Sequence, residues 1–421
     1  MTSEAPTTAF VWVWLPGRTD PIVAGRLDQD GEQLAFTYGQ SYLEREEALP
    51  LSRSELPLKP GTQSPLGNLN MAGCLRDASP DAWGRRVIMN KTLGQEGRDA
   101  DPAILSELTY LLESGSDRIG ALDFQVSANE YIPRQTKQAS LDELLQSAER
   151  VQEGIPLSPD LDLALAHGSS IGGARPKAML EDGDTKYIAK FSTQGDPYNV
   201  VKGEFIAMRL AALCGLNVAN VKLTQAMGKD VLLIGRFDRE HSKSGWNRLL
   251  MQSALTLLRL DEMTARYASY EDLADLIRKE FSNPSETLKE LFVRLVFNII
   301  CGNTDDHARN HAAFWNGESY TLTPAYDICP QNRTGNETGQ AMLISGNVNM
   351  SRLTTCLEAS HRFHLSKDQA REIISSQVDV INNQWAGVCD EASMSEVDRN
   401  FFWHRQFLNP FSLVGFEGTA K

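Results

Sequence analysis

The sequence lacks several features that mark common classes of protein. Its six cysteines are widely spaced and include no Cys-x-x-Cys pair, which disfavours a zinc ribbon or redox motif and favours a reducing compartment. No apolar run approaches the roughly 20 residues that span a bilayer. The first residues lack the basic and apolar stretches of a signal peptide. We therefore expect a cytoplasmic protein without membrane contact.

Basic residues are in deficit, because 41 Lys and Arg stand against 55 Asp and Glu, a formal net charge of −14. Such an acidic chain is disfavoured as an independent nucleic-acid binder. A hydrophobic content of 41% with 23% charged residues is ordinary for a globular protein and excludes global disorder. At 421 residues the chain exceeds one ordinary core, so we expect two to three domains.

The first part of the chain has the pattern of short strands. Alternating apolar residues predict strands at 10–14 and 34–38, with a turn at 28–31. After a proline-rich loop, Ser79 is expected to cap a helix. The polar, helical stretch at 130–153 suits a connection between domains.

The middle of the chain predicts two hairpins, at 175–191 and 218–237, each with turn residues between apolar runs. From Leu249 onward the pattern is mainly helical. The longest clear helix is predicted at 285–301, where apolar residues recur on one side. A small β-rich part therefore precedes a larger α-rich part.

A glycine-rich stretch, Gly-Ser-Ser-Ile-Gly-Gly-Ala-Arg-Pro-Lys, ends at Lys177. Closely spaced glycines let backbone N–H groups approach phosphate oxygens, and the lysine adds a positive charge. The stretch is not a Walker A loop, because the Gly-Lys-Ser/Thr ending is missing. A simple turn between two elements is the alternative interpretation.

Lys190 is centred in an apolar strand. A lysine that points inward from a strand is costly unless it meets an anion, such as a nucleotide phosphate. Glu204, near the start of the next predicted helix, is a second possible partner. The alternative is a surface lysine on an edge strand.

The strongest cluster, Asn-Thr-Asp-Asp-His-Ala-Arg-Asn-His, occupies 303–311, directly after the long helix. Predicted strands at 313–315 and 320–323 flank an Asn-Gly turn, and Asp327 follows them. This order is typical of a protein kinase, which needs an aspartate at the attacking hydroxyl, an asparagine for metal, a hairpin and another metal-binding aspartate. An Asn/Asp-rich capping loop explains the residue types but not their order.

Within this cluster, Asp305 and Asn310 have the D-x-x-x-x-N spacing of a kinase catalytic loop, and Asp306 fits it less well. Adjacent residues on regular structure cannot both face one substrate, so Asp305 is the predicted catalytic carboxylate. His307 and His311 have the spacing of a zinc helix, but no glutamate follows the first and no third ligand is evident.

Taken together, these motifs resemble those of HipA-type serine/threonine kinases, the toxin half of bacterial toxin–antitoxin pairs. The matching stretches are Ser79–Arg85, Ile119–Leu122, Ser170–Lys177, Asn303–His311 and Tyr326–Ile328. The resemblance implies an α+β, protein-kinase-like two-lobed fold. It would consist of a β-rich N-terminal subdomain at 1–128, a small lobe at 129–248 and a mostly helical large lobe at 249–421.

The resemblance also assigns site residues. Asp305 would be the catalytic aspartate, and Asn310 and Asp327 would hold Mg²⁺. The residues assigned to ATP are Ser170, Gly172, Gly173, Lys177, Lys190, Phe237, His307, Arg309 and Tyr326. A hinge at 231–237 would meet adenine through its backbone, since Gly235 stands where some members carry an acidic residue.

Ser170 corresponds to the loop serine that family members autophosphorylate, although Ser169 beside it leaves the modified position ambiguous. A phosphate there would carry a charge of about −1.5 to −2 next to the nucleotide and would switch the kinase off. We therefore expect a kinase that inactivates itself.

The resemblance further implies a helix-turn-helix antitoxin of the HipB type, with DNA contacted only through it. The implied substrates are proteins, aminoacyl-tRNA synthetases in several members. Two alternatives stay open: a small-molecule kinase on the same lobes, and a pseudokinase that acts as a corepressor with a DNA-binding partner. The pseudokinase is disfavoured, because every predicted phosphate-binding and metal-binding position carries a residue that can perform that role.

Overall fold

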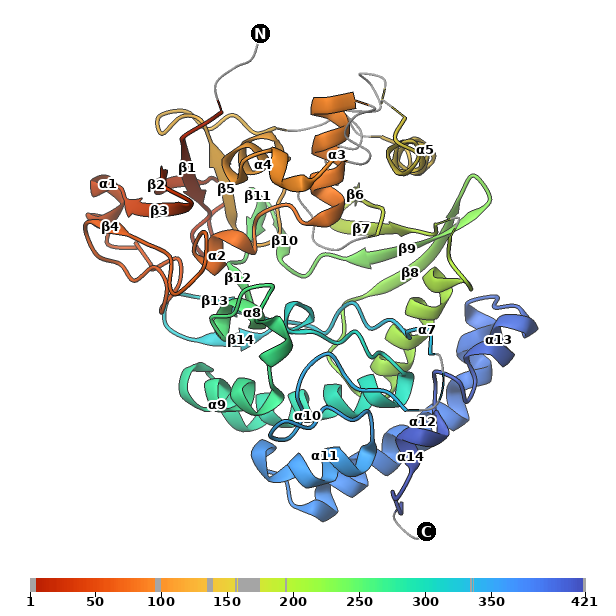
Figure 1. Ribbon diagram of the computed structural model, residues 1–421. Coiled ribbons are helices and arrows are strands. Elements are labelled where there is room, and N and C mark those ends of the chain that lie inside the picture. The colour runs from red at the N-terminus through yellow and green to blue at the C-terminus, as the bar shows by residue number, and fades with distance from the viewer. Residues whose placement is uncertain are drawn as a thin grey trace. The chain divides into compact units, whose positions relative to one another are not determined.

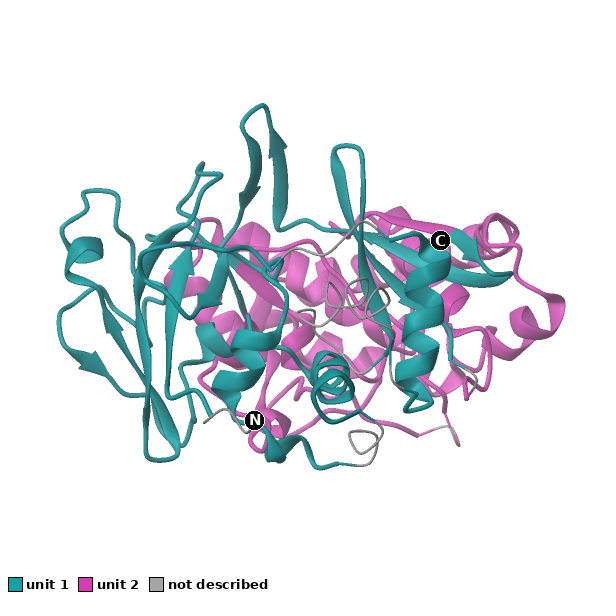
Figure 2. Cartoon of the chain, turned by 90° about the horizontal axis from the view of Figure 1, so that it is seen from above, with its two compact units in different colours: residues 1–193, 224–252, 314–318 teal, residues 194–223, 253–313, 319–421 magenta. Residues whose placement is uncertain are grey.

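The structure, a computed structural model, describes residues 5–94, 100–134, 139–155, 157, 175–193, 195–333, 335 and 337–418. The chain forms two compact units, each made of several separate segments (Figure 2). Unit 1 consists of 1–193, 224–252 and 314–318, and unit 2 consists of 194–223, 253–313 and 319–421. Within the described ranges, no helix combines the length and apolarity needed to cross a membrane.

Unit 1 contains a five-stranded antiparallel sheet in the order β4-β3-β2-β1-β5 (Figure 1). Its strands are β1 (Thr8–Val13), β2 (Ile22–Asp30), β3 (Gln33–Tyr38), β4 (Thr62–Gln63) and β5 (Leu122–Gln125). The predicted strands at 10–14 and 34–38 correspond to β1 and β3, but the sequence analysis missed β2, which pairs with both. Charged residues on β2, such as the ion-paired Arg26 and Asp28, obscure its apolar alternation.

The helices of unit 1 are α1 (Gln40–Leu43), α2 (Gly73–Arg76), α3 (Ala82–Leu93), η2 (Pro102–Ile104), α4 (Glu107–Glu113) and α5 (Leu141–Gln152). The expectation that Ser79 caps a helix is wrong. Helix α3 begins after Asp81, and within the described ranges the buried Ser79 hydroxyl has no hydrogen-bond partner. The Ser79 N–H instead donates to the Arg76 carbonyl (2.9 Å), so this serine belongs to the turn after α2.

A four-stranded sheet has the order β6-β7-β9-β8, and it contains both predicted hairpins. Its strands are β6 (Lys177–Asp182), β7 (Thr185–Phe191), β8 (Val221–Ala226) and β9 (Lys229–Gly235). Helices α3 and α5 lie against it and share one hydrophobic core with it (Figure 1). The polar stretch predicted as a connection therefore includes α5, whose apolar side is part of this core.

The remaining strands form two small sheets. A hairpin joins β10 (Arg239–Ser242) to β11 (Gly245–Arg248), and a three-stranded sheet has the order β12-β13-β14. The strands of that sheet are β12 (Met251–Ser253), β13 (Ala312–Trp315) and β14 (Tyr320–Leu322). Strands β13 and β14 confirm the hairpin predicted between the catalytic-loop motif and Asp327.

Unit 2 is mainly helical. Its described helices are α7 (Val200–Leu213), α8 (Ala254–Leu257), η4 (Ala265–Tyr267), α9 (Tyr270–Glu280), α10 (Pro284–Cys301), η5 (Ala308–Asn310), α11 (Leu353–Ala359), η6 (Ser360–Phe363), α12 (Lys367–Glu391), α13 (Glu396–Phe402) and α14 (Pro410–Leu413). Helix α10 confirms the prediction at 285–301. Its Phe292 is fully buried against the ring of Phe363, and Gln377 of α12 donates to the Val293 carbonyl (2.9 Å). The helix is therefore a fixed base for the residues that follow it.

Candidate active site

The candidate catalytic loop, 303–311, begins where α10 ends at Gly302. This glycine adopts the left-handed conformation (φ 73°), and its N–H donates to carbonyls of the last helical turn. A Cβ at this position would lie 2.7 Å from the carbonyl oxygen of Gln406. The backbone N–H of Asn303 then donates to the Asn298 carbonyl (2.9 Å). The loop therefore starts from a point that only glycine can occupy without strain.

We expect Gly302→Ala to lower the free energy of unfolding by about 3 kcal/mol, because the left-handed conformation costs roughly 1–2 kcal/mol and overpacking roughly 1–3 kcal/mol. Urea unfolding followed by circular dichroism measures the loss. Gly387→Ala in α12 is the matched control, since its Cβ would meet no atom within 4 Å. Equal stabilities for the two variants would contradict this explanation of the loop.

Asp306 is the structural member of the Asp305–Asp306 pair. Its side chain is buried, accepts a hydrogen bond from the Tyr270 hydroxyl, and lies 3.0 Å from Nε2 of His311. Both partners are themselves buried. Because a buried carboxylate is stable only with such partners, Asp306 holds the loop in place and does not face a substrate.

Asp305, by contrast, is exposed. Its backbone carbonyl, not its carboxylate, takes part in the loop, accepting from the His307 N–H (2.9 Å) and from Nδ2 of Asn310 (3.2 Å). The two adjacent carboxylates therefore lie in different environments, and Asp305 is the more accessible of the two.

Partial desolvation raises the pKa of the Asp305 carboxyl above its ordinary value. The nearby His307 opposes this rise in pKa, and the negative charges of Asp327 and Asp306 add to it. A raised pKa makes the carboxylate a stronger base.

Asp327 is placed by its neighbour Tyr326. The Tyr326 hydroxyl donates to the Arg309 carbonyl (2.6 Å), which ties the segment after β14 to the catalytic loop. Asp327 itself has a φ of 57°, a left-handed conformation that is uncommon for residues other than glycine. Such backbone strain is frequent at functional sites, where the surroundings enforce it.

The side chains of Asn310 and Asp327, the two predicted metal ligands, carry oxygen atoms of the kind that Mg²⁺ prefers. A cation at this place would also relieve the repulsion between the carboxylates of Asp327 and Asp305. In the described part of the chain, no three His, Cys, Asp or Glu side chains gather into a metal site. Oxygen donors such as these suit a magnesium ion, which would complete its coordination with phosphate oxygens and water.

Two further predicted residues lie on the same loop. His307 is half-buried, and its buried Nδ1 has no hydrogen-bond partner among the residues that the structure describes. Arg309 forms an ion pair with Glu262. Both residues therefore belong to the loop that carries Asp305. The ion pair gives Arg309 a structural role in addition to the nucleotide contact predicted for it.

In unit 1, Lys177 and Lys190 lie directly opposite one another on β6 and β7. Directly opposite residues point to one face of a sheet, and the adjacent Ala178 and Ala189 belong to the core under α3 and α5. Both lysines therefore lie on the other face, where Lys177 is only 3% exposed. Like charges in this arrangement destabilise a sheet unless neighbouring groups neutralise them.

The alternative interpretation of Lys190 as an edge-strand residue is wrong, because β7 lies between β6 and β9. On β9, Leu232 is paired with Lys190, so the lysine face continues with the apolar Leu232 and Ile234. Phe237 follows this strand, and its ring contacts that of Phe314 edge to face (6.0 Å). Ser170, Gly172 and Gly173 lie outside the described residues.

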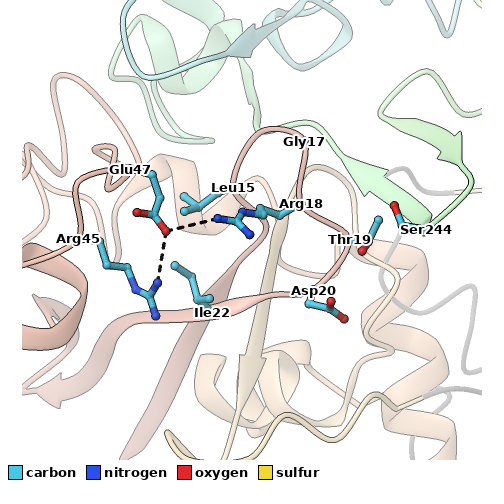
Figure 3. Close-up of a pocket in the computed structure, with 9 residues that line it drawn as sticks. All are labelled: Leu15, Gly17, Arg18, Thr19, Asp20, Ile22, Arg45, Glu47 and Ser244. Atoms are coloured by element: carbon cyan, nitrogen blue, oxygen red, sulfur yellow. Dashed lines mark hydrogen bonds and ion pairs between the residues drawn. The ribbon is translucent and has the colours of Figure 1, made fainter.

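A cavity of about 350 Å³ lies elsewhere in unit 1 (Figure 3). Figure 3 shows Arg18 and Arg45 both directed at the carboxylate of Glu47, at 3.8 and 3.3 Å. The cavity contains none of the predicted site residues. Because Glu47 is shared by both arginines, the cavity is not a simple anion site.

The fold places the chain in a defined class. A HipA chain solved in a Shewanella oneidensis complex of HipA, HipB and operator DNA is 20% identical, with a TM-score of 0.68 over 94% of this chain and 96% of that chain. The chain combines helices with sheets, and its structure is similar to that HipA chain. Together these observations define an α+β, kinase-like fold, as the sequence predicts. The model of the HipA N-terminal domain matches residues 13–125, and that of the HipA-like C-terminal domain matches 169–385.

Relatives agree with these matches. Y4mE of Sinorhizobium fredii, a candidate kinase by its name, is 27% identical over 344 residues, 76% of this chain and 77% of the relative. The serine/threonine-protein kinase toxin HipA of Shewanella oneidensis is 27% identical over 187 residues, 38% of this chain and 42% of that protein. The chain belongs to the HipA family, and at family level it is a HipA-like kinase.

Sequence reasoning missed the residues that hold the catalytic loop. Tyr270 precedes Asp306 by 36 residues, which include helices α9 and α10, and no local pattern connects the two. His311 was considered only as a zinc ligand, whereas it contacts Asp306. The Asp-Asp pair itself was the signal available in the sequence, since a carboxylate of the pair that is buried needs hydrogen-bond partners from elsewhere in the chain.

Proposed function

We propose that this chain is an ATP- and magnesium-dependent serine/threonine protein kinase of a bacterial toxin–antitoxin system. The observation that carries the proposal is the contrast between the two adjacent aspartates. Asp305 is exposed at the catalytic spacing from Asn310, while the buried Asp306 fixes the loop. A helix-capping loop would not need one free and one anchored carboxylate.

Asp305 orients the attacking hydroxyl and accepts its proton, and its raised pKa favours that transfer. Asn310 and Asp327 hold magnesium, which when bound neutralises and orients the phosphates of ATP. His307, Arg309 and Tyr326 border the nucleotide. Tyr326 acts mainly through Asp327, because its hydroxyl is already bonded to the loop.

The sheet of unit 1 supplies the groups that bind ATP. Lys177 and Lys190 share one face and neutralise phosphate charge. On the same face, Leu232 and Ile234 offer apolar contact to the base. The hinge at 231–237 reads adenine through backbone groups at its end beyond Gly235, because the backbone of 231–235 belongs to β9 and is paired with both β7 and β8.

The proposed partner is a helix-turn-helix antitoxin of the HipB type, as in the complex of the similar Shewanella chain. A net charge of −14 favours docking to a basic partner and makes DNA contact indirect. The proposed substrate is a protein in the cytoplasm, such as an aminoacyl-tRNA synthetase.

Self-phosphorylation gives a test that needs no identified substrate. After incubation with ATP and magnesium, mass spectrometry should find one phosphate on the glycine-rich loop, at Ser170 rather than Ser169. Ser170→Ala should prevent the modification, and the modified enzyme should lose activity because like charges repel beside the γ-phosphate. Asp305→Asn is the matched catalytic control.

The outcomes separate the alternatives. A small-molecule kinase would leave itself unmodified and consume ATP only with a suitable acceptor from a panel. A pseudokinase corepressor would consume no ATP at all. Transfer to a protein without modification of Ser170 would keep the kinase and remove the self-inactivation.

A further inference from the structure

A cluster of buried charges directly follows β9, the strand that leads into the hinge. Arg236, Asp238 and Arg239 are 7%, 3% and 6% exposed. Burial of charged groups is costly unless each is paired and hydrogen-bonded. The segment 236–239, here called the post-hinge segment, is therefore fixed by partners elsewhere in unit 1.

Asp117, in the connection between α4 and β5, is the central partner. Its Oδ1 accepts from Nη2 of Arg239 (2.8 Å) and from Nη1 of Arg236 (3.1 Å). Its Oδ2 accepts from Nζ of Lys186 on β7 (2.8 Å). The Asp117 carboxylate therefore binds three cationic side chains: two arginines of the post-hinge segment and a lysine of β7.

The backbone beside Asp117 makes further contacts with the post-hinge segment. The Arg118 carbonyl accepts from Nη2 of Arg236 (2.6 Å). The Gly120 N–H donates to Oδ2 of Asp238 (2.8 Å), and the Gly120 carbonyl accepts from Nη1 of Arg239 (2.8 Å). Residues 117–120 therefore bind the post-hinge segment through both side-chain and main-chain groups.

The cluster stays charged at neutral pH. Burial raises the pKa of Asp117, but the charges of Arg236 and Arg239 outweigh it and hold the pKa well below its ordinary range. The same balance lowers the pKa of Asp238 to about 2. Burial and the charge of Arg236 lower the pKa of Arg239 only to about 10, so its guanidinium remains protonated.

The post-hinge segment is also in register with the lysine face. The Arg236 N–H donates to the Lys186 carbonyl (2.8 Å), which extends the β7–β9 pairing beyond Gly235. Lys186 and Lys190 lie on one strand, roughly 13 Å apart by the rise of an extended chain. A nucleotide with its phosphates at Lys190 would therefore place its base near this anchored end.

We propose that residues 117–120 position the hinge for adenine recognition, with Asp117 as a positioning residue. This inference rests on the proposed function, because it concerns the nucleotide of that kinase. Recognition of a base by backbone groups requires them to be held within about 0.5 Å. Release of the post-hinge segment should therefore weaken adenine recognition more than phosphate binding.

The test is steady-state kinetics of the full chain with ATP and with GTP as phosphate donors. Asp117→Asn keeps the shape but removes the charge, and should raise KM for ATP about tenfold with kcat nearly unchanged. KM for GTP should change little, so the preference for ATP falls. Asp117→Glu restores the charge and should recover much of the ATP affinity. If the asparagine variant fails to fold, the ATP-to-GTP preference of the glutamate variant is measured in its place.

Arg134→Gln is the matched control, because it removes an ion pair with the buried Asp123 (2.7 Å) without touching the post-hinge segment. It should lower thermal stability and leave the ATP-to-GTP preference intact. An Asp117→Asn protein that is less stable but keeps the wild-type preference would overturn the inference alone. A wild-type chain that uses neither nucleotide would overturn the proposed function and this inference with it.

Discussion

Asp305→Asn is expected to lower kcat for phosphoryl transfer by about 10²- to 10⁴-fold, the usual contribution of a positioned general base. The amide keeps the shape of the side chain but cannot take the proton of the attacking hydroxyl. Affinity for magnesium–ATP should be retained, because the proposed ligands of the metal are Asn310 and Asp327. Transfer from γ-labelled ATP and calorimetric binding measure the two properties on the same protein.

Asp306→Asn is the matched neighbour for that experiment. Its carboxylate is buried with Tyr270 and His311, so its loss should cost about 1–3 kcal/mol of stability and spare much of the activity of the folded protein. A fully active Asp305→Asn protein beside a folded but inactive Asp306→Asn protein would reverse the two roles.

Asp327→Asn is expected to weaken ATP binding in magnesium by about 100-fold, or ~2.7 kcal/mol, down to the affinity measured in EDTA. The carboxylate is the charged member of the proposed metal pair, and the substitution removes the negative charge that attracts Mg²⁺. Calorimetric titration with and without magnesium measures the difference.

Asp368→Asn is the control for Asp327, since this aspartate of α12 is 94% exposed at its side chain. It should bind ATP as the wild type does. If the wild-type chain binds ATP equally tightly in EDTA, the assignment of Asn310 and Asp327 as metal ligands is wrong.

Local patterns predicted much of the fold. Apolar periodicity located α10, and turn residues located the hairpins β6–β7 and β13–β14, because each signal lies within one short segment. Strand β2 was missed because charged residues such as Arg26 and Asp28 mask its alternation. The role of α5 was missed because only the structure shows which sheet its apolar side covers.

The candidate site divides in the same way. The spacing from Asp305 to Asn310 is a local signal, and the structure adds why Asp305 and not Asp306 is open. Contacts such as Tyr270 with Asp306, or Asp117 with Arg236, join residues far apart in sequence. They follow from the packing of whole elements, which no single stretch of sequence encodes.

Calorimetric titration of the full chain with magnesium–ATP tests the proposed nucleotide binding most directly. We expect one ATP per chain, with affinity strongly reduced by Lys190→Met and by Asp327→Asn. Absence of binding by the wild-type chain, or an affinity that neither substitution changes, would contradict the proposed ATP- and magnesium-dependent kinase.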